Sequence, residues 1–327
     1  MAEANKTSAP PSGTTPTTQQ TWPFRQLLPD GLNLDFVGKR HFFLILSTVL
    51  NLLAVGLFFV RPLNYGVDFT GGTAIRMRFS ETTTANTLRK ELDPLELRDL
   101  TVQDFGDRGR EFLIRFEITE GAEMSSVAET LGTLFKETHG ESKFEILSVE
   151  SVGPKVGEGL RRQGFLAVAV ATLFMGIYIA FRFDLSFGLG AVVALVHDVM
   201  IAAGALMLTQ LTFDLTTLAA LLTVVGFSVH DTIIVSDRVR ENLKRYPKEG
   251  LAAVINRSIN ETLSRTLLTT GTALFVLIAL YLLGGKGLEP FAFTLLVGFI
   301  TGTYSSVYIA GPVVLFWSGD KRSSARA

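Results

Sequence analysis

Residues 185–240 read LSFGLGAVVALVHDVMIAAGALMLTQLTFDLTTLAALLTVVGFSVHDTIIVSDRVR. The stretch holds two apolar runs, 185–208 and 215–236, which a short polar turn separates. Each run exceeds the ~18 residues that a helix needs to cross the hydrocarbon core of a bilayer. Each also carries a histidine–aspartate pair, His197-Asp198 and His230-Asp231. A carboxylate in mid-span costs about 2.5–3.5 kcal/mol on insertion scales, so Asp198, which small and apolar residues surround, is the first candidate for function.

Four further apolar runs have about the length of a membrane span: 42–60, 164–181, 266–283 and 291–317. The composition agrees, because 47% of the 327 residues are hydrophobic and 19% are charged, against about 25% charged in a typical soluble domain. The sequence therefore predicts an α-helical membrane protein with six transmembrane helices.

Several classes of function are disfavoured by composition. The net charge of −1 shows no general bias towards nucleic acid. Cysteine is absent, which excludes disulfides, cysteine-ligated zinc and thiol nucleophiles. The four histidines lack the spacing of a metal-binding motif. We expect no metal, no cofactor and no enzymatic activity.

The predicted orientation follows from lysine and arginine, which are enriched in cytoplasmic loops. Both residue types gather before the first run, within 237–265 and in the C-terminal tail, so both termini are predicted to be cytoplasmic. Residues 250–262, inside that loop, fit either a helix lying in the membrane interface or an ordinary connecting helix. The predicted organisation is a disordered tail at 1–35, a first helix at 36–60, an extracytoplasmic domain at 61–160, five helices at 161–317 with a cytoplasmic loop at 237–265, and a cytoplasmic tail at 318–327.

The inserted domain shows strand and helix patterns in alternation. Apolar and polar residues alternate in its predicted strands, and apolar residues recur at helical spacing in its predicted helices. The strands are Thr73–Phe79, Leu100–Phe105, Glu111–Ile118 and Phe144–Val152, and the helices are Thr84–Leu92 and Ser125–Thr138. The order β-α-β-β-α-β predicts an α+β ferredoxin-like domain.

Asp198 lies on a stripe of small residues, Gly190, Ala194 and Ala202, so it should face another helix. The last run has a similar stripe, Gly298, Gly302, Ser306 and Ala310. The two faces are candidates to pack on each other or on the same faces of a partner. Asp198 is then either part of a proton route or a hydrogen-bonded structural acid. Arg238, seven residues after Asp231 on the same helical face, is the candidate charge partner or a plain membrane anchor. We expect supporting polar roles for His197, His230 and Asp231. Asp198 is predicted near mid-depth and Asp231 nearer the cytoplasmic face, so the two acids should not share a protease-like site.

Four motifs in this chain resemble the SecF family, the smaller subunits of the bacterial SecDF complex for protein export. They are GVDFTGG at 66–72, ALVHD at 194–198, VGFSVHDTIIVSDRVREN at 225–242 and RTLLTTG at 265–271. The resemblance covers about residues 35–317, everything except the two tails.

The resemblance implies six spans and one periplasmic domain in the bacterial inner membrane, with lipid around the helices. It implies a SecD-like partner, association with the SecYEG channel, and use of the proton motive force to move preproteins. It further implies that Asp198 and Arg238 serve proton passage. Asp68, Gly71 and Gly72 form a turn between membrane and domain, which we expect to be either a lever or a tight turn that needs glycine. A related small-molecule exporter and a non-conducting structural subunit remain alternatives.

Overall fold

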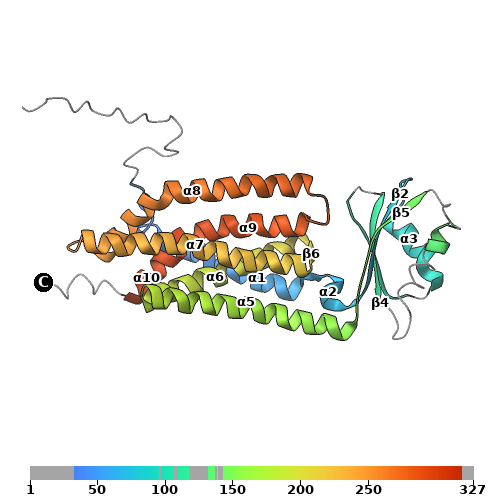
Figure 1. Cartoon of the computed structure of the whole chain (residues 1–327), viewed down its shortest axis with the longest axis horizontal. Coiled ribbons are helices and arrows are strands. Elements are labelled where there is room, and N and C mark those ends of the chain that lie inside the picture. Colours follow the sequence, from blue (N-terminus) through green and yellow to red (C-terminus); the bar gives the residue numbers. More distant parts are fainter. Residues whose placement is uncertain are drawn as a thin grey trace, which may run out of the picture. The chain divides into compact units, whose positions relative to one another are not determined.

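The computed structural model describes residues 33–95, 97–106, 109–117, 132–136, 138 and 143–318. The predicted tails therefore lie almost entirely outside the described residues. Six helical segments are long and apolar enough to cross a membrane, which confirms the predicted spans. They are α1 (Arg40–Val60), α5 (Pro154–Arg182), α6 (Leu185–Thr209), α7 (Leu215–Arg245), α8 (Leu251–Leu283) and a last segment, Glu289–Ser318. The protein is a multi-pass membrane protein, and Figure 1 shows these helices running side by side.

Several helices extend beyond their apolar runs. Pro154 begins α5 directly after Gly153, so the inserted domain, predicted to end at residue 160, ends at residue 153. At the other end of the bundle, α7 and α8 continue until only residues 246–250 connect them. Polar side chains join these extensions: the Asn242 amide donates to Ser258 Oγ at 3.0 Å. The predicted loop at 237–265 is thus mostly helix.

The segment 250–262 is neither an interface helix nor a separate connector, because it forms the first part of α8. Its apolar side chains belong to the bundle core together with Phe36 and Val37. Its polar side bears Asn256 and Asn260, whose amides bond the backbone of the chain just before α1, at Leu34 and Phe36. These contacts explain the amphipathic pattern without a membrane surface.

The last segment is interrupted. It consists of α9 (Glu289–Ser305), a π-helical turn η2 (Ser306–Ala310) and α10 (Gly311–Ser318). Its small-residue stripe divides between two neighbours. Gly298 and Gly302 lie against α7, and Ala310 lies against Gly190 of α6. The predicted packing on α6 is therefore confirmed only at the η2 end.

The inserted domain contains β2 (Gly72–Phe79), α3 (Ala85–Leu92), β3 (Arg98–Asp104), β4 (Glu111–Glu117) and β5 (Phe144–Val152), with a short turn η1 (Asp93–Leu95) after α3. The sheet order is β3-β4-β2-β5 and neighbouring strands are antiparallel. This arrangement is compatible with the predicted ferredoxin-like sandwich. Its second helix falls mostly outside the described residues, of which 132–136 are helical.

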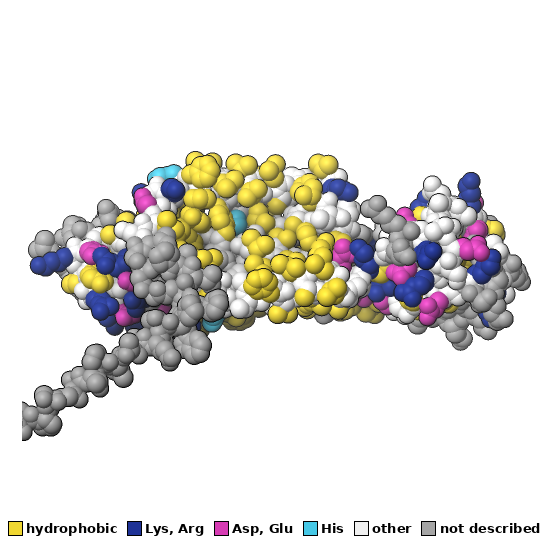
Figure 2. Space-filling model, turned by 90° about the horizontal axis from the view of Figure 1, so that it is seen from above, with side chains coloured by type: hydrophobic (Ala, Val, Ile, Leu, Met, Phe, Trp, Pro, Cys, Tyr) yellow, Lys and Arg dark blue, Asp and Glu magenta, His cyan; other side chains and the backbone are white. Residues whose placement is uncertain are grey.

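Two short strands join the domain to the bundle. β1 (Asn64–Tyr65) follows α1 and pairs in parallel with β6 (Thr212–Phe213), which lies between α6 and α7. The four-residue helix α2 (Val67–Thr70) then leads to β2. Figure 2 shows hydrophobic side chains over the middle of the bundle and charged side chains towards its ends and on the domain. This distribution fits a bundle surrounded by hydrocarbon.

Candidate functional site

Asp198 joins three helices at the centre of the bundle. Its side chain is 0% exposed. Ser228 of α7 and Ser305 of α9 donate hydrogen bonds to its Oδ2 at 2.6 and 2.7 Å. Its Oδ1 lies 2.9 Å from Nδ1 of His197. Both oxygens of this carboxylate are therefore hydrogen-bonded, as the structural alternative for Asp198 requires.

Asp231 of α7 is equally buried, at 0% exposed, but much less well bonded. Its Oδ2 accepts one long hydrogen bond from Thr303 Oγ1, at 3.4 Å. Its Oδ1 has no hydrogen-bond partner among the described residues. An unpaired buried carboxylate is costly, so a group in this position is held neutral by a proton or balanced by a cation.

Threonine side chains of α8 and α9 lie near Asp231. Thr303 of α9 also bonds Thr270 of α8, with 2.8 Å between the two hydroxyls. The antiparallel pairing of α7 with α8 places Asp231 level with the turn between Thr266 and Thr270. Thr266 is buried, and its hydroxyl has no partner within the described part of the chain.

Asp231 lies late in the apolar run 215–236 of α7, towards the Arg245 end of the helix relative to Asp198, which is the predicted direction. Ser228, which bonds Asp198, precedes Asp231 by three residues, a rise of about 4.5 Å along the helix. The two carboxylates nevertheless use different partners, so they do not form one shared site.

Arg238 does not pair with Asp198 in this chain. Its Nε lies 2.5 Å from Glu261 and its Nη1 lies 2.6 Å from Glu241, in the polar extension of α7. Asp237, the residue before Arg238, lies 3.8 Å from Arg182. The Arg238 side chain is 29% exposed. The pair with Glu261 joins α7 to α8, the pair with Glu241 lies within α7, and the pair between Asp237 and Arg182 joins α7 to α5.

The two histidines differ in environment. His197 is buried beside Tyr304, with ring centroids 5.8 Å apart, and its Nε2 has no partner in the described structure. His230 is exposed on α7. Arg265, also exposed, was predicted in a loop but lies well inside α8. His230 and Arg265 both act electrostatically on Asp231.

Exposed charged side chains on membrane-spanning helices require a partner other than hydrocarbon. Thr223 and His230 of α7 are exposed, as is Arg265, which directly precedes the apolar run of α8, and we call these three residues the polar face. The described residues contain no group of three His, Cys, Asp or Glu side chains that could hold a metal ion. The polar face is therefore a candidate protein contact.

Asp68 connects the domain-side turn to α7. Its Oδ2 accepts a hydrogen bond from the backbone N–H of Leu215, the first residue of α7, at 3.0 Å. Asp214 caps the same helix by accepting from the Thr217 N–H at 2.8 Å. Gly66 N–H donates to the Phe213 carbonyl at 2.7 Å. The segment that begins with Gly66 is thus bonded to the beginning of the helix that carries Asp231.

Gly71 and Gly72 form a tight turn in close contact with other backbone. Their φ values are +76° and +99°, a region that side chains disfavour. A Cβ on Gly71 would lie 2.6 Å from Pro154 Cα, and one on Gly72 would lie 2.7 Å from the Phe116 carbonyl oxygen. Both glycines are required for steric reasons. This close packing makes the connection between α2 and β2 rigid.

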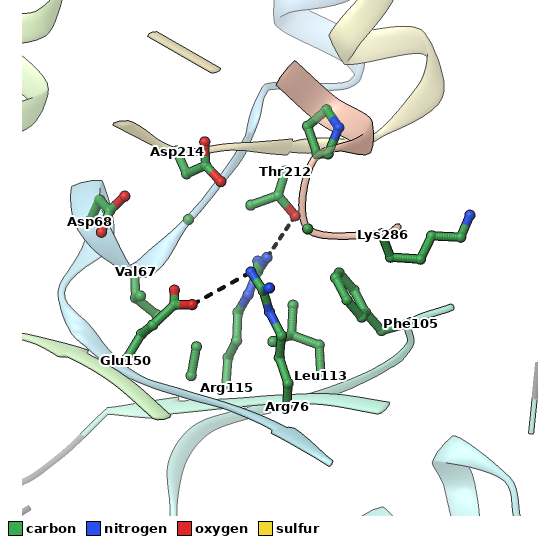
Figure 3. Close-up of a pocket in the computed structure, with 14 residues that line it drawn as sticks. Val67, Asp68, Arg76, Phe105, Leu113, Arg115, Glu150, Thr212, Asp214 and Lys286 are labelled. Carbon is green, nitrogen blue, oxygen red and sulfur yellow. Dashed lines mark hydrogen bonds and ion pairs between the residues drawn. The ribbon is translucent and has the colours of Figure 1, made fainter. Parts of the chain in front are cut away.

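Arg115 of β4 fastens the sheet to the bundle. It donates to Asn64 Oδ1 at 3.0 Å, to the Tyr65 carbonyl at 3.3 Å and to Thr212 Oγ1 at 3.0 Å. Burial, helped by the neighbouring Arg76, lowers the pKa of the Arg115 guanidinium. Arg76 in turn lies 3.5 Å from Glu150 (Figure 3). Arg76, Arg115, Glu150 and Thr212 help to line a small cavity of about 30 Å³ between the sheet and the bundle.

Comparison with known proteins now places the chain in a family. The family described as "Protein export membrane protein SecD/SecF, C-terminal" matches residues 130–320, and the "SecD/SecF GG Motif" matches residues 56–83. The chain belongs to the SecD/SecF protein-export family. It is 41% identical to "Protein translocase subunit SecF" of Calditerrivibrio nitroreducens over 91% of this chain and 99% of that protein. The SecF subunit of Magnetococcus marinus is 44% identical over 92% of this chain and 97% of its own.

A solved SecD/SecF structure has the same fold. The crystal structure of SecDF, "a translocon-associated membrane protein" from Thermus thermophilus, matches with a TM-score of 0.79 and 38% identity. The match covers 88% of this chain but only 39% of that longer chain. The protein is thus a SecF-type membrane subunit with a role in protein export.

Sequence reasoning missed two residues of this site. Arg115 was not singled out, although alternation in β4 places it on the face opposite Ile114 and Phe116 of the domain core. The apolar run begins after Arg265, so the sequence predicts a loop at this position. Its position in the RTLLTTG motif was the available signal.

Proposed function

We propose that this subunit helps a SecDF-type complex to use the proton motive force in moving preproteins through the Sec channel. The observation that carries the proposal is Asp231, a buried and under-bonded carboxylate in the middle of α7. A proton that crosses about 100 mV releases roughly 2.3 kcal/mol. That energy is comparable to the cost of rearranging one or two buried hydrogen bonds.

The proton is loaded on Asp231 in this proposal, and Asp198 holds the helices that respond. Protonation changes the hydrogen bond between Asp231 and Thr303 of α9. Ser305, two residues further along α9, binds Asp198 on α6. Protonation of Asp231 thus alters a contact between α7 and α9, two of the helices that the Asp198 carboxylate joins. The sequence had favoured Asp198 as the protonated acid, with Arg238 as its partner; their contacts support structural roles.

Movement of α7 reaches the inserted domain through bonded contacts. Asp68 holds the beginning of α7, and Arg115 holds Thr212 just before it. Gly71 and Gly72 connect Asp68 firmly to the first strand of the sheet. We propose that the domain follows α7 and acts on a preprotein outside the membrane. The lever role expected for the glycine turn becomes that of a stiff connector.

The complex lies in the bacterial inner membrane with both termini cytoplasmic in this proposal. SecD covers the polar face of Thr223, His230 and Arg265, where it supplies groups that satisfy the exposed cation. SecYEG and the preprotein are the remaining partners. The support is the placement of basic residues at the end of the bundle away from the domain.

Asp231→Asn and Asp198→Asn test the function in cells that have no other copy. We expect Asp231→Asn to abolish the export that depends on the proton motive force while the subunit still assembles with SecD. We expect Asp198→Asn to retain part of it, because the amide oxygen can accept from Ser228 and Ser305. Full export by Asp231→Asn would favour a non-conducting structural subunit.

A further inference from the structure

A long apolar groove runs along α6 between α1 and α5. Its volume is about 640 Å³. Along α6 it extends from Val192 to Met207, a length of about 22 Å at the rise of an α-helix. Thr172 is the one polar side chain among the described residues that line it. The groove thus offers an apolar channel that is somewhat longer than the ~15 Å of one leaflet of hydrocarbon.

Packing explains why the groove lies near the inserted domain. At the far end, α5 and α6 touch closely, because Gly176 lies against Val192 and Gly188 lies against Ala180. Nearer the domain, the α5 residues from Phe165 to Leu173 line the groove instead. The groove therefore lies in the domain-side part of the bundle.

Two arginines lie at the domain-side end of the groove. Arg61 directly follows the end of α1, whose residues Phe58 and Phe59 line the groove. Arg162 lies one turn before Phe165, on the face of α5 that also presents Ala169. Both arginines are exposed. Guanidinium groups bind phosphate through paired charge-assisted hydrogen bonds, so this end of the groove matches an anionic headgroup.

A partner helix fits the groove less well than lipid does. Polar side chains that need a protein partner lie on α7 and α8, and Figure 1 shows α5 and α8 along opposite edges of the bundle. The groove wall offers no comparable group. A membrane-crossing helix is also about 30 Å long and 10–12 Å wide, whereas the groove runs for only about 22 Å along α6.

We propose that the groove binds one phospholipid from the leaflet on the domain side, with an acyl chain between α1 and α5 and its phosphate between Arg61 and Arg162. The acyl chain then contacts Val196 and Val199, the α6 residues next to His197-Asp198. The bound lipid supports the turn of α6 that carries the buried carboxylate. This inference is independent of which acid carries the proton.

The first test uses native mass spectrometry of the full chain in complex with its SecD partner, with phosphatidylglycerol added. We expect one tightly held lipid per complex at this site, and at least a tenfold weaker retention in Ala169→Phe with Ala203→Phe, which fill the groove. Arg61→Gln with Arg162→Gln should remove the preference for phosphatidylglycerol over phosphatidylcholine. Ala167→Phe, on the exposed side of α5, is the matched control and should retain the lipid.

The second test identifies the occupant. A photo-crosslinking amino acid at Val196 should capture phospholipid in intact membranes, and groove-filling variants should reduce the yield. Capture of a polypeptide at this position would overturn the proposal in favour of a protein contact. Unchanged lipid retention in both the filled and the arginine-free variants would also overturn it.

Discussion

The carboxylate of Asp198 should hold α6, α7 and α9 together. Substitution of its two serine partners measures how much these hydrogen bonds contribute to the free energy of unfolding. Ser228→Ala and Ser305→Ala each delete one hydroxyl bond of 2.6–2.7 Å to the Asp198 Oδ2 atom. Hydrogen bonds to charged groups contribute about 1.5–3 kcal/mol in soluble proteins. Interhelical hydrogen bonds in membranes average only ~0.6 and reach ~1.7 kcal/mol. We therefore expect each substitution to lower the free energy of unfolding by about 0.6–1.7 kcal/mol.

The assay is equilibrium unfolding of the chain in lipid bilayers, arranged as a double-mutant cycle with Asp198→Ala. In the Asp198→Ala background, each serine substitution should cost almost nothing, so the coupling free energy should equal most of the single-variant effect. Ser236→Ala is the matched control, because Ser236 lies on the same helix and donates only to the Thr232 carbonyl of its own turn. A coupling below about 0.3 kcal/mol at both serines would refute the structural role of Asp198.

Three further predictions concern the connections at the two ends of the bundle. Gly72→Ala should destabilise the chain by about 1–2 kcal/mol or more, because φ is +99° and the new Cβ would lie against the Phe116 carbonyl oxygen. Gly226→Ala is the control, because a Cβ there meets open space. Thermal melting in nanodiscs compares the two variants. Arg115→Met should widen the distance distribution between spin labels on the sheet and on α7, whereas Arg115→Lys should restore it in part; an unchanged distribution would mean that Arg115 does not fasten the sheet. Arg238→Gln should lower the free energy of unfolding by no more than about 1 kcal/mol and leave export nearly normal, because the ion pairs of Arg238 with Glu261 and Glu241 are partly exposed. A loss of proton-driven export with normal assembly would instead show that Arg238 takes part in proton passage.

Local patterns in the sequence predicted much of the fold. The six spans follow from the lengths of apolar runs, and the strands from alternation, since each signal depends on neighbouring residues only. The limits of α7 and α8 were missed because the length rule counts apolar residues, whereas Asn242 and Ser258 stabilise polar helix beyond the membrane. The π-helical turn after Ser305 has no recognisable local pattern.

The site was only partly predictable, because its chemistry depends on contacts between distant helices. The sequence indicated that Asp198 and Asp231 were costly, but hydrogen-bond partners decide their roles. Ser228 and Ser305 satisfy Asp198, while Asp231 has a single long bond from Thr303. The small-residue stripe correctly predicted that Asp198 faces other helices. It could not reveal which acid would be left with an unpartnered oxygen.

Proton movement through the reconstituted complex tests the central proposal most directly. The chain and its SecD partner are placed in proteoliposomes that contain a pH-sensitive dye, and a membrane potential is imposed. We predict internal acidification with the native chain, none above background with Asp231→Asn, and substantial acidification with Ser236→Ala. Acidification by Asp231→Asn at the native rate, in complexes that assemble normally, would contradict the assignment of the proton to Asp231.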